Sequence, residues 1–154
     1  MTQVNRIEIA IAIGADHRGF LYKKILMSCT QSADCTIIIT WHDVGAYDSE
    51  RSDYPGFAQA AAELVAEGAV AGAVLICGTG IGMAIAANRV PHTYAGVVWT
   101  EEIARKAKED DNVNVLVIPA DYVSAEVMQA CFAAWLTTSF RGGHYAERLQ
   151  QIDE

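Results

Sequence analysis

The sequence predicts an α/β protein in which a five-stranded parallel sheet lies between two layers of helices. Short apolar runs rich in β-branched residues alternate along the chain with segments whose apolar residues recur at helical spacing. The most apolar run ends at a cysteine and three alternate glycines, which is typical of a tight turn from a strand into a helix. The 154 residues, 52% of them hydrophobic, are enough for one domain covering residues 1–154. We therefore expect a three-layer αβα sandwich of the Rossmann-like type.

The first half of the chain predicts two strands and two helices. Polar and apolar residues alternate from the first residues onward, and Ile7–Ile13 is the first strand. The helix after it carries an apolar stripe at Leu21, Ile25, Leu26 and Cys29. The β-branched run Thr36–Trp41 is the second strand. Tyr54-Pro55 starts the next helix, which is alanine-rich over Ala58–Val65.

The second half predicts three more strands and three helices. The central strand is Ala73–Ile76, and the helix after the glycines is built from small and apolar residues. Tyr94–Trp99 is the fourth strand, Glu101–Glu109 a short helix and Asn114–Ile118 the fifth strand. The apolar stripe of a final long helix consists of Val123, Val127, Cys131 and Trp135.

A candidate catalytic loop follows the central strand, where Cys77 is succeeded by Gly78, Gly80 and Gly82. Free N–H groups of such a loop and of the first helical turn can hold an anion or an oxyanion. A thiol beside a positive helix terminus has its thiolate favoured, so Cys77 is a candidate base or nucleophile. The alternative is a cysteine that only fills the core, which is the commoner role. Met83 stands where a dinucleotide fingerprint has its third glycine, so a nicotinamide fold is a weaker match.

Other polar residues are predicted at the carboxyl ends of strands, where ligands bind in such sheets. Asp16 and His17 follow the first strand, and Asp16 is equally suited to be a helix N-cap. The polar segment Ala46–Asp53 is long for a connection between a strand and a helix, so it is expected to shape a site that includes Tyr54. Thr79 lies within the glycine loop itself.

Net charge, cysteine spacing and the length of apolar runs limit the classes of partner and the compartment that we expect for this protein. A net charge of −8 argues against nucleic acid as a partner, and it requires an anionic substrate to meet a local cationic pocket. The four cysteines lack metal-site spacing, and the alternation over Met1–Ile13 differs from a signal-peptide core. We expect a reduced cytoplasmic protein with no metal or cofactor. A membrane partner is not expected either, because no apolar run approaches the ~20 residues of a membrane span. The tail Arg141–Arg148 is cationic in an otherwise acidic chain.

Motifs in the same order over nearly the whole chain resemble the ribose-5-phosphate isomerase B family, which also includes the galactose-6-phosphate isomerases. These motifs are Cys-Gly-Thr-Gly-Ile-Gly-Met-x-Ile-Ala-Ala-Asn from Cys77 to Asn88, Gly14–Phe20, Ser49–Pro55, Asn114–Leu116 and Phe140-x-Gly-Gly ahead of Arg148. The resemblance implies an aldose–ketose isomerase of a sugar phosphate that works through a cis-enediolate without a cofactor. It also implies a homo-oligomer, a dimer or a pair of dimers, with each site built between two subunits.

The resemblance assigns roles by position. Cys77 would move a proton between C1 and C2, Thr79 would serve the hydroxyl and carbonyl oxygens, and the loop amides would hold the developing charge. Asp110 falls where the family has its ring-opening histidine, and we include it as a catalytic candidate. The candidate substrate-binding residues are Asp16, His17, Tyr54, Gly78, Gly80, Gly82, Asn88, Asp111, His144 and Arg148.

The sequence also departs from the family pattern. Asp110-Asp111 replaces His-Asn, while Asp121 and His144 stand where arginines are expected, which leaves Arg148 in register and Arg141 nearby. Guanidinium groups bind phosphate more strongly than other side chains, so these changes affect the expected phosphate site. An isomerase of a different or non-phosphorylated sugar therefore stays an alternative. A non-catalytic subunit or sugar-phosphate-binding module is a second alternative, and a nucleotide-binding module a third.

Overall fold

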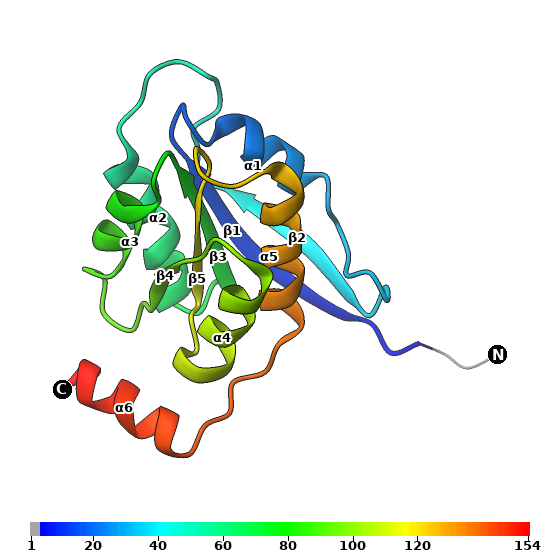
Figure 1. The fold of residues 1–154 in the computed structure, drawn as a ribbon, viewed down its shortest axis with the longest axis vertical. Coiled ribbons are helices and arrows are strands. Elements are labelled where there is room, and N and C mark those ends of the chain that lie inside the picture. Colours follow the sequence, from blue (N-terminus) through cyan, green and yellow to red (C-terminus); the bar gives the residue numbers. More distant parts are fainter. Residues whose placement is uncertain (1–3) are drawn as a thin grey trace.

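The structure, a computed structural model, describes residues 4–154 and has one parallel sheet with helices on both faces (Figure 1). The strands are β1 (Ile7–Ala15), β2 (Ile37–Asp43), β3 (Gly72–Cys77), β4 (Ala95–Val97) and β5 (Val115–Pro119). The helices are α1 (Phe20–Met27), α2 (Tyr54–Ala66), α3 (Ile81–Ala87), α4 (Glu101–Asp111), α5 (Ala125–Thr137) and α6 (His144–Asp153). This confirms the predicted α/β fold with five parallel strands. The predicted alternation of polar and apolar residues starts at Met1, and its first three positions lie outside the described residues.

The strand order β2-β1-β3-β5-β4 places β3 at the centre of the sheet. All of its residues are buried, because helices cover both of its faces. Helices α1, α4 and α5 pack on one face and α2 and α3 on the other (Figure 1). From β1 the chain adds β2 on one side and β3 on the other, so the topological switch point lies between β1 and β3. In sheets of this type, ligands bind at the carboxyl ends of the strands beside the switch point.

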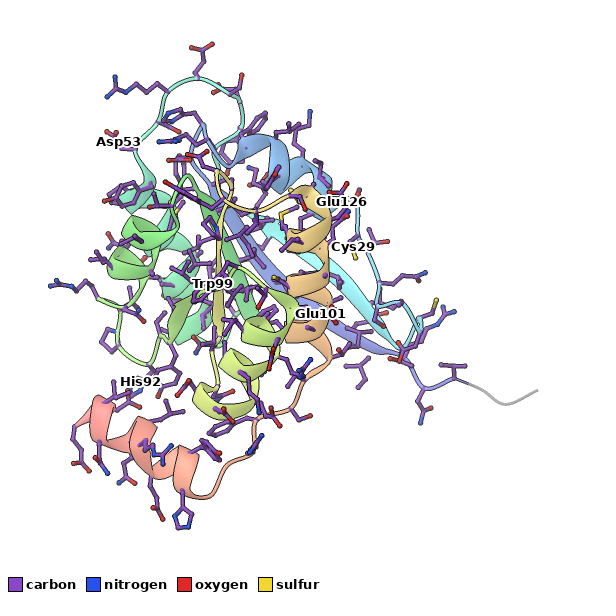
Figure 2. All side chains as sticks on the ribbon, in the orientation of Figure 1. Cys29, Asp53, His92, Trp99, Glu101 and Glu126 are labelled. Carbon is purple, nitrogen blue, oxygen red and sulfur yellow. The ribbon has the colours of Figure 1, made fainter. Side chains whose placement is uncertain are left out.

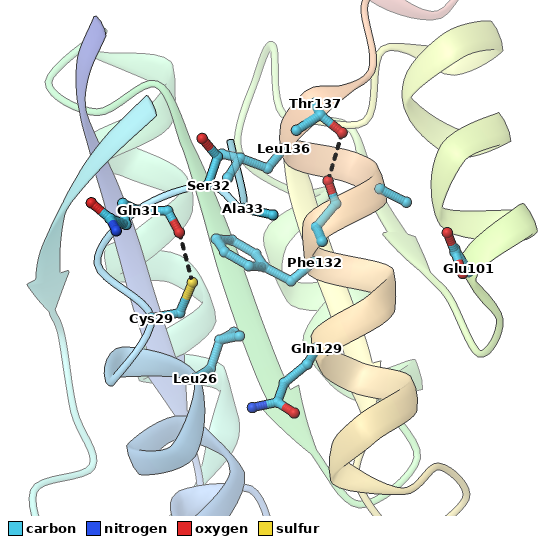
Figure 3. Close-up of a pocket in the computed structure, with 12 residues that line it drawn as sticks. Leu26, Cys29, Gln31, Ser32, Ala33, Glu101, Gln129, Phe132, Leu136 and Thr137 are labelled. Carbon is cyan, nitrogen blue, oxygen red and sulfur yellow. Dashed lines mark hydrogen bonds between the residues drawn. The ribbon is translucent and has the colours of Figure 1, made fainter. Parts of the chain in front are cut away.

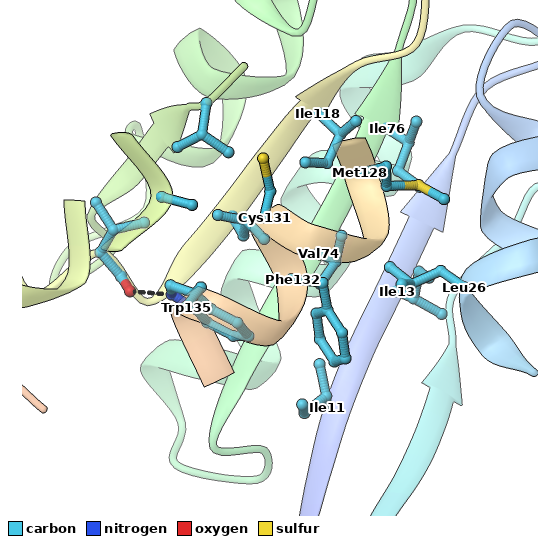
Figure 4. Close-up of a cluster of buried hydrophobic side chains, with 14 of the residues drawn as sticks. Ile11, Ile13, Leu26, Val74, Ile76, Ile118, Met128, Cys131, Phe132 and Trp135 are labelled. Atoms are coloured by element: carbon cyan, nitrogen blue, oxygen red, sulfur yellow. Dashed lines mark hydrogen bonds between the residues drawn. The ribbon is translucent and has the colours of Figure 1, made fainter. Parts of the chain in front are cut away.

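Side chains of β3 alternate between two separate apolar clusters. Val74 and Ile76 point toward α5, where Met128, Phe132 and Trp135 fill the larger cluster (Figure 4). The indole Nε1 of Trp135 also donates to the backbone oxygen of Val113 at 2.6 Å. Leu75 and Cys77 point to the other cluster, beneath α2 and α3. The thiol of Cys77 therefore leaves the sheet on the α2–α3 side.

The predicted strands differ from the observed ones by at most two residues at each end, and one helix was not predicted. The fourth strand is limited to Ala95–Val97, because the amide of Tyr94 donates to Asn114 Oδ1 at 2.8 Å and Thr100 caps α4. The tail is predicted only as a cationic segment, whereas His144–Asp153 form α6. Among the residues of α6 only Leu149 is buried, so no apolar stripe marked it as a helix. None of the helices in residues 4–154 combines the length and the apolar character needed to cross a membrane.

Candidate active site

A cleft of about 400 Å³ opens at the carboxyl end of β3. Its lining comes from the end of β1, the start of α2, the glycine loop and the exposed face of α3. The residues are Asp16, Arg18, Tyr54, Cys77, Gly78, Thr79, Ile81, Gly82 and Ile85. The structure thus brings together six of the predicted site residues around one thiol, and it adds three residues that sequence reasoning did not name.

Cys77 is the last residue of β3 and is 5% exposed. The amide of Gly80 donates to its Sγ at 3.2 Å. Burial raises the pKa of the thiol above its ordinary value and nearby Asp16 adds to this, although the amides of Gly80, Met83 and Thr79 favour the thiolate. Our expectation of a favoured thiolate is therefore wrong in direction for this chain, because desolvation outweighs the amide donors.

Each of the three loop positions requires glycine for a structural reason. Gly80 has φ +75°, a backbone conformation that side chains with a Cβ rarely adopt. A Cβ on Gly78 would lie 2.7 Å from Arg18 Nε, and one on Gly82 would lie 2.4 Å from Tyr54 Cζ. The loop therefore allows two cleft side chains to approach its backbone closely. Thr79 lies on the exposed side of the loop, where its Oγ1 accepts from the amide of Ile81 at 3.3 Å.

Asp16 and Arg18 form the opposite wall of the cleft. Asp16 is nearly buried, and its Oδ1 accepts from the amides of Arg18 and Gly19 at 2.9 and 3.2 Å. It thus closes the turn before α1, while Gly19 holds the N-cap position itself. The guanidinium of Arg18 forms an ion pair with Asp121 above Gly78. Sequence reasoning missed Arg18, although its place beside His17 at a strand end was a usable signal.

The segment between β2 and α2 is attached to the same edge of the sheet. His17 Nδ1 lies 3.2 Å from both the amide nitrogen and the carbonyl oxygen of Ser52. Lys23 is fully buried, and its Nζ donates to Asp43 Oδ1 at 2.8 Å and to the carbonyl oxygen of Ala46. These contacts fix both ends of the segment, so the start of α2, and with it Tyr54, is held against the cleft.

Asp110 and Asp111 lie at the other end of the sheet within the same chain. Helix α4 starts after β4 at the carboxyl edge and runs back to the start of β5. Asp110 Oδ1 is 3.3 Å from Arg141 Nε, and the same guanidinium contacts Glu109 Oε1 at 2.7 Å. Hydrogen bonds from Lys106 and Arg141 lower the pKa of Glu109. The chain therefore holds Asp110 in a cationic contact away from Cys77.

His144 and Arg148 lie on α6, which is also at the amino-terminal edge of the sheet. The end of α6 contacts the segment before β4, where the hydroxyl of Tyr94 donates to Asp153 and His92 lies beside it (Figure 2). Burial and the Asp153 carboxylate raise the pKa of Tyr94 to about 12, so the hydroxyl keeps its proton. Within one chain, His144 and Arg148 therefore lie away from the cleft at Cys77.

Asn88, at the C-terminus of α3, has a structural role in this chain. Its Nδ2 donates to the carbonyl oxygen of Ala95 at 2.9 Å, and its Oδ1 accepts from the amide of the same residue at 2.8 Å. It does not line the cleft, because α3 carries it away from the carboxyl edge. Both polar groups of the side chain thus bond to the backbone beside β4, which fixes its orientation away from the cleft.

A second cavity, of about 420 Å³, lies between α1, the segment before β2 and α5 (Figure 3). Leu26, Phe132 and Leu136 make most of it apolar, and Gln31 and Gln129 lie at its rim (Figure 3). It contains none of the predicted site residues. The cleft at Cys77, by contrast, combines its thiol with charged side chains of both signs, Asp16 and Arg18.

A parallel sheet with helices on both faces defines a Rossmann-like α/β protein, and the cleft at the carboxyl end of its central strand is the candidate site. Comparison with known proteins specifies the class further. Residues 11–152 match the Ribose/Galactose Isomerase family, and the chain belongs to this family. It is an isomerase.

Relatives and solved structures agree on this assignment. The chain is 35% identical to ribose-5-phosphate isomerase B of Escherichia coli over 142 residues, which are 92% of this chain and 93% of the relative. The ribose 5-phosphate isomerase of Thermotoga maritima superposes with a TM-score of 0.86 at 32% identity, covering 94% of this chain and 97% of that one. Ribose-5-phosphate isomerase B from Mycoplasma genitalium, solved with bound ribulose-5-phosphate, has a TM-score of 0.81 at 30% identity, covering 96% and 95%.

Proposed function

We propose that this chain interconverts the aldose and ketose forms of a sugar phosphate, of the ribose 5-phosphate type, through a cis-enediolate. The observation that carries the proposal is the thiol of Cys77 in a cleft shared with Thr79 and the glycine loop. Family membership and the ribulose-5-phosphate bound to the Mycoplasma genitalium relative support this class of substrate.

In the proposed reaction Cys77 acts as the base. Its thiolate takes a proton from C2 of the aldose, which leaves an enediolate, and the resulting thiol returns that proton to C1. Thr79 exchanges a proton between the hydroxyl and carbonyl oxygens. The loop amides from Gly78 to Gly82 stabilise the negative charge on the enediolate oxygen, and one such donor is worth roughly 3 kcal/mol in comparable sites. The proton is conserved, so the reaction needs no external oxidant.

We further propose that each complete site uses two chains. Cys77 lies at the carboxyl edge of the sheet, whereas Asp110, His144 and Arg148 lie beyond its amino-terminal edge. The six residues of β3 span about 20 Å, which is longer than an extended five-carbon sugar phosphate. One substrate molecule can contact both groups if a two-fold partner brings its α4 and α6 to the cleft. A homodimer, or two paired dimers, satisfies this requirement.

A cytoplasmic location is part of the proposal. Cys29, Cys35, Cys77 and Cys131 are all free thiols. Free cysteines are typical of proteins in reducing compartments. The proposed base also needs an unoxidised sulfur.

Asp110 bears on which sugar is used. Pentose and hexose phosphates rest mostly as closed rings, and the position of the family's ring-opening histidine is taken here by Asp110, which contacts the Arg141 guanidinium at 3.3 Å. A four-carbon 4-phosphate cannot close a five-membered ring, because its O4 is esterified. We therefore propose a preference shifted toward such an acyclic sugar phosphate.

The test is an isomerisation panel of tetrose, pentose and hexose phosphates with their unphosphorylated forms. We expect turnover of at least one phosphorylated sugar, and a higher kcat/KM for erythrose 4-phosphate than for ribose 5-phosphate. Asp110→His should raise the ribose 5-phosphate value. No turnover of any phosphorylated sugar would refute the isomerase proposal. Efficient turnover of ribose 5-phosphate, without a gain from histidine, would refute only the substrate preference.

A further inference from the structure

The cleft at Cys77 has to accept an anionic group in a chain whose net charge is −8. Among the described residues that line it, Arg18 is the one with a positive charge, while Asp16 is negative. The cationic residues of α6 lie at the far edge of the sheet. The half of the site that each chain supplies around its own thiol therefore depends on Arg18 for attraction of an anion.

Backbone contacts place Arg18 over the glycine loop. Its amide donates to Asp16 Oδ1 at 2.9 Å, which fixes the start of the side chain. A Cβ on Gly78 would lie 2.7 Å from Nε and 2.8 Å from Cζ of the Arg18 guanidinium. The absence of a side chain at Gly78, directly after Cys77, thus makes room for a cation beside the proposed base.

The carboxylate of Asp121 forms an ion pair with the Arg18 guanidinium beside the glycine loop. The amide of Asp121 donates to the carbonyl oxygen of Gly78 at 3.0 Å, and the amide of Ala120 donates to that of Cys77 at 2.9 Å. The carboxylate is thereby fixed beside the loop and forms an ion pair with Arg18. The Arg18 side chain is 55% exposed and that of Asp121 32% exposed, so water screens the pair and the carboxylate is a weak competitor.

We propose that Arg18 binds the anionic group of the substrate in the cleft, and that Asp121 holds its guanidinium in place until that group displaces the carboxylate. The assignment rests on the proposed function and makes Arg18 a specificity-determining residue for phosphorylated over unphosphorylated sugars. A guanidinium can donate two parallel hydrogen bonds to a phosphate, as it can to a carboxylate. The exchange replaces a single negative charge by a phosphate that carries nearly two.

The competing explanation is that the ion pair only fixes the turn after β5. The two explanations predict different effects on anion affinity when Arg18 and Asp121 are replaced one at a time. A structural pair predicts that Arg18→Met and Asp121→Asn have similar effects, because either change breaks the same contact. A binding role predicts opposite effects on anion affinity, because Arg18→Met removes the receptor whereas Asp121→Asn removes its competitor.

The experiment measures the affinity for inorganic phosphate by calorimetry, together with KM and kcat for the best sugar phosphate of the panel. Arg18→Met should weaken phosphate binding and raise KM by about tenfold or more. Asp121→Asn should tighten phosphate binding by about two- to fivefold. Arg6→Met, an exposed change ahead of β1 and outside the cleft, is the matched control and should leave phosphate affinity unchanged.

Unchanged phosphate affinity in folded Arg18→Met, or equal weakening in both variants, would overturn the assignment. Circular dichroism and urea unfolding of each variant separate these outcomes from a loss of fold. If the wild-type chain turns over no sugar phosphate, the proposed function fails on its own. Phosphate binding by Arg18→Met and Asp121→Asn still decides the role of Arg18 in that case.

Discussion

The Gly80 amide donates to the thiol of Cys77 from within the same turn, at 3.2 Å. This contact favours a thiolate, whereas burial of the sulfur and the negative charge of Asp16 favour a protonated thiol and raise the pKa. The thiol that we propose as the base thus has a raised pKa in the isolated chain. Its activity should depend on how much thiolate is present when the substrate binds.

Replacing the sulfur is the direct test of this base. Cys77→Ser should lower kcat by at least about 100-fold, because a hydroxyl is a far weaker base than a thiol. The fold should persist, since serine is close to cysteine in size. Cys29→Ser is the matched control, because Cys29 lies outside the cleft, and it should keep near-normal activity. A folded Cys77→Ser enzyme with normal kcat would assign Cys77 to core packing alone.

The pH profile of kcat/KM tests the same group in the free enzyme. Because the pKa of Cys77 is raised above its ordinary value, the thiolate fraction is small at neutral pH and grows about tenfold per pH unit below that pKa. We expect log kcat/KM to rise with a slope near one from about pH 7 to about pH 9. A flat or falling profile over that range would identify a base that is already ionised at neutral pH.

Gly19 provides a test of the fold beneath the site. A Cβ there would lie 2.3 Å from the carbonyl oxygen of Ile76, an atom of the central strand that cannot move aside. Gly19→Ala should therefore lower the free energy of unfolding by about 1–3 kcal/mol, measured by urea denaturation. Gly56→Ala, in α2 with nothing within 4 Å, should be neutral or stabilising by up to about 1 kcal/mol. Equal stability of both variants would contradict the described packing of α1 against β3.

Mixing two inactive variants tests the two-chain site. Cys77→Ser and Arg148→Ala change opposite ends of one chain, so a mixed dimer contains one site with both residues intact. Refolding them together in equal amounts should restore about a quarter of the wild-type activity, because half of the dimers are mixed and each has one good site.

The control pairs Cys77→Ser with Thr79→Ala. Both changes lie in the same cleft, so every site in a mixed dimer lacks one of the two groups and no activity should return. Recovery in neither mixture would mean that Cys77 and Arg148 do not meet across an interface. Light scattering on the active wild-type enzyme would give the same answer if it found a monomer.

The parts of the fold that were predicted correctly are those with a strong local pattern. The strand ending at Cys77 is an unbroken apolar run and is present as β3. The helical spacing of Val127, Cys131 and Trp135 is present in α5, which starts after Val123. Helix α6 was missed because it packs mainly through Leu149 and carries polar residues elsewhere. Local patterns fail where a segment gains its structure from a few distant contacts.

The same limit explains the errors at the site. The raised pKa of Cys77 comes from burial beneath α2 and α3, which the residues next to it in the sequence do not reveal. The contact between Arg18 and Asp121 joins two strand ends that only the sheet order brings together. Asn88 belongs to a matching motif, yet its side chain bonds to Ala95 in this chain.

Those bonds from Asn88 have a consequence for how two copies can associate. Ala95 lies on the outermost strand β4, and both of its outward-facing backbone groups are occupied by one side-chain amide. At the opposite margin, the amide of Ile39 donates to the carbonyl oxygen of Thr30, and the amide of Ser32 donates to that of Ile37. At these positions both margins of the sheet already bond within the chain, which disfavours the addition of a strand from another molecule there. We therefore expect copies of this chain to associate through helices and loops rather than through the edges of their sheets.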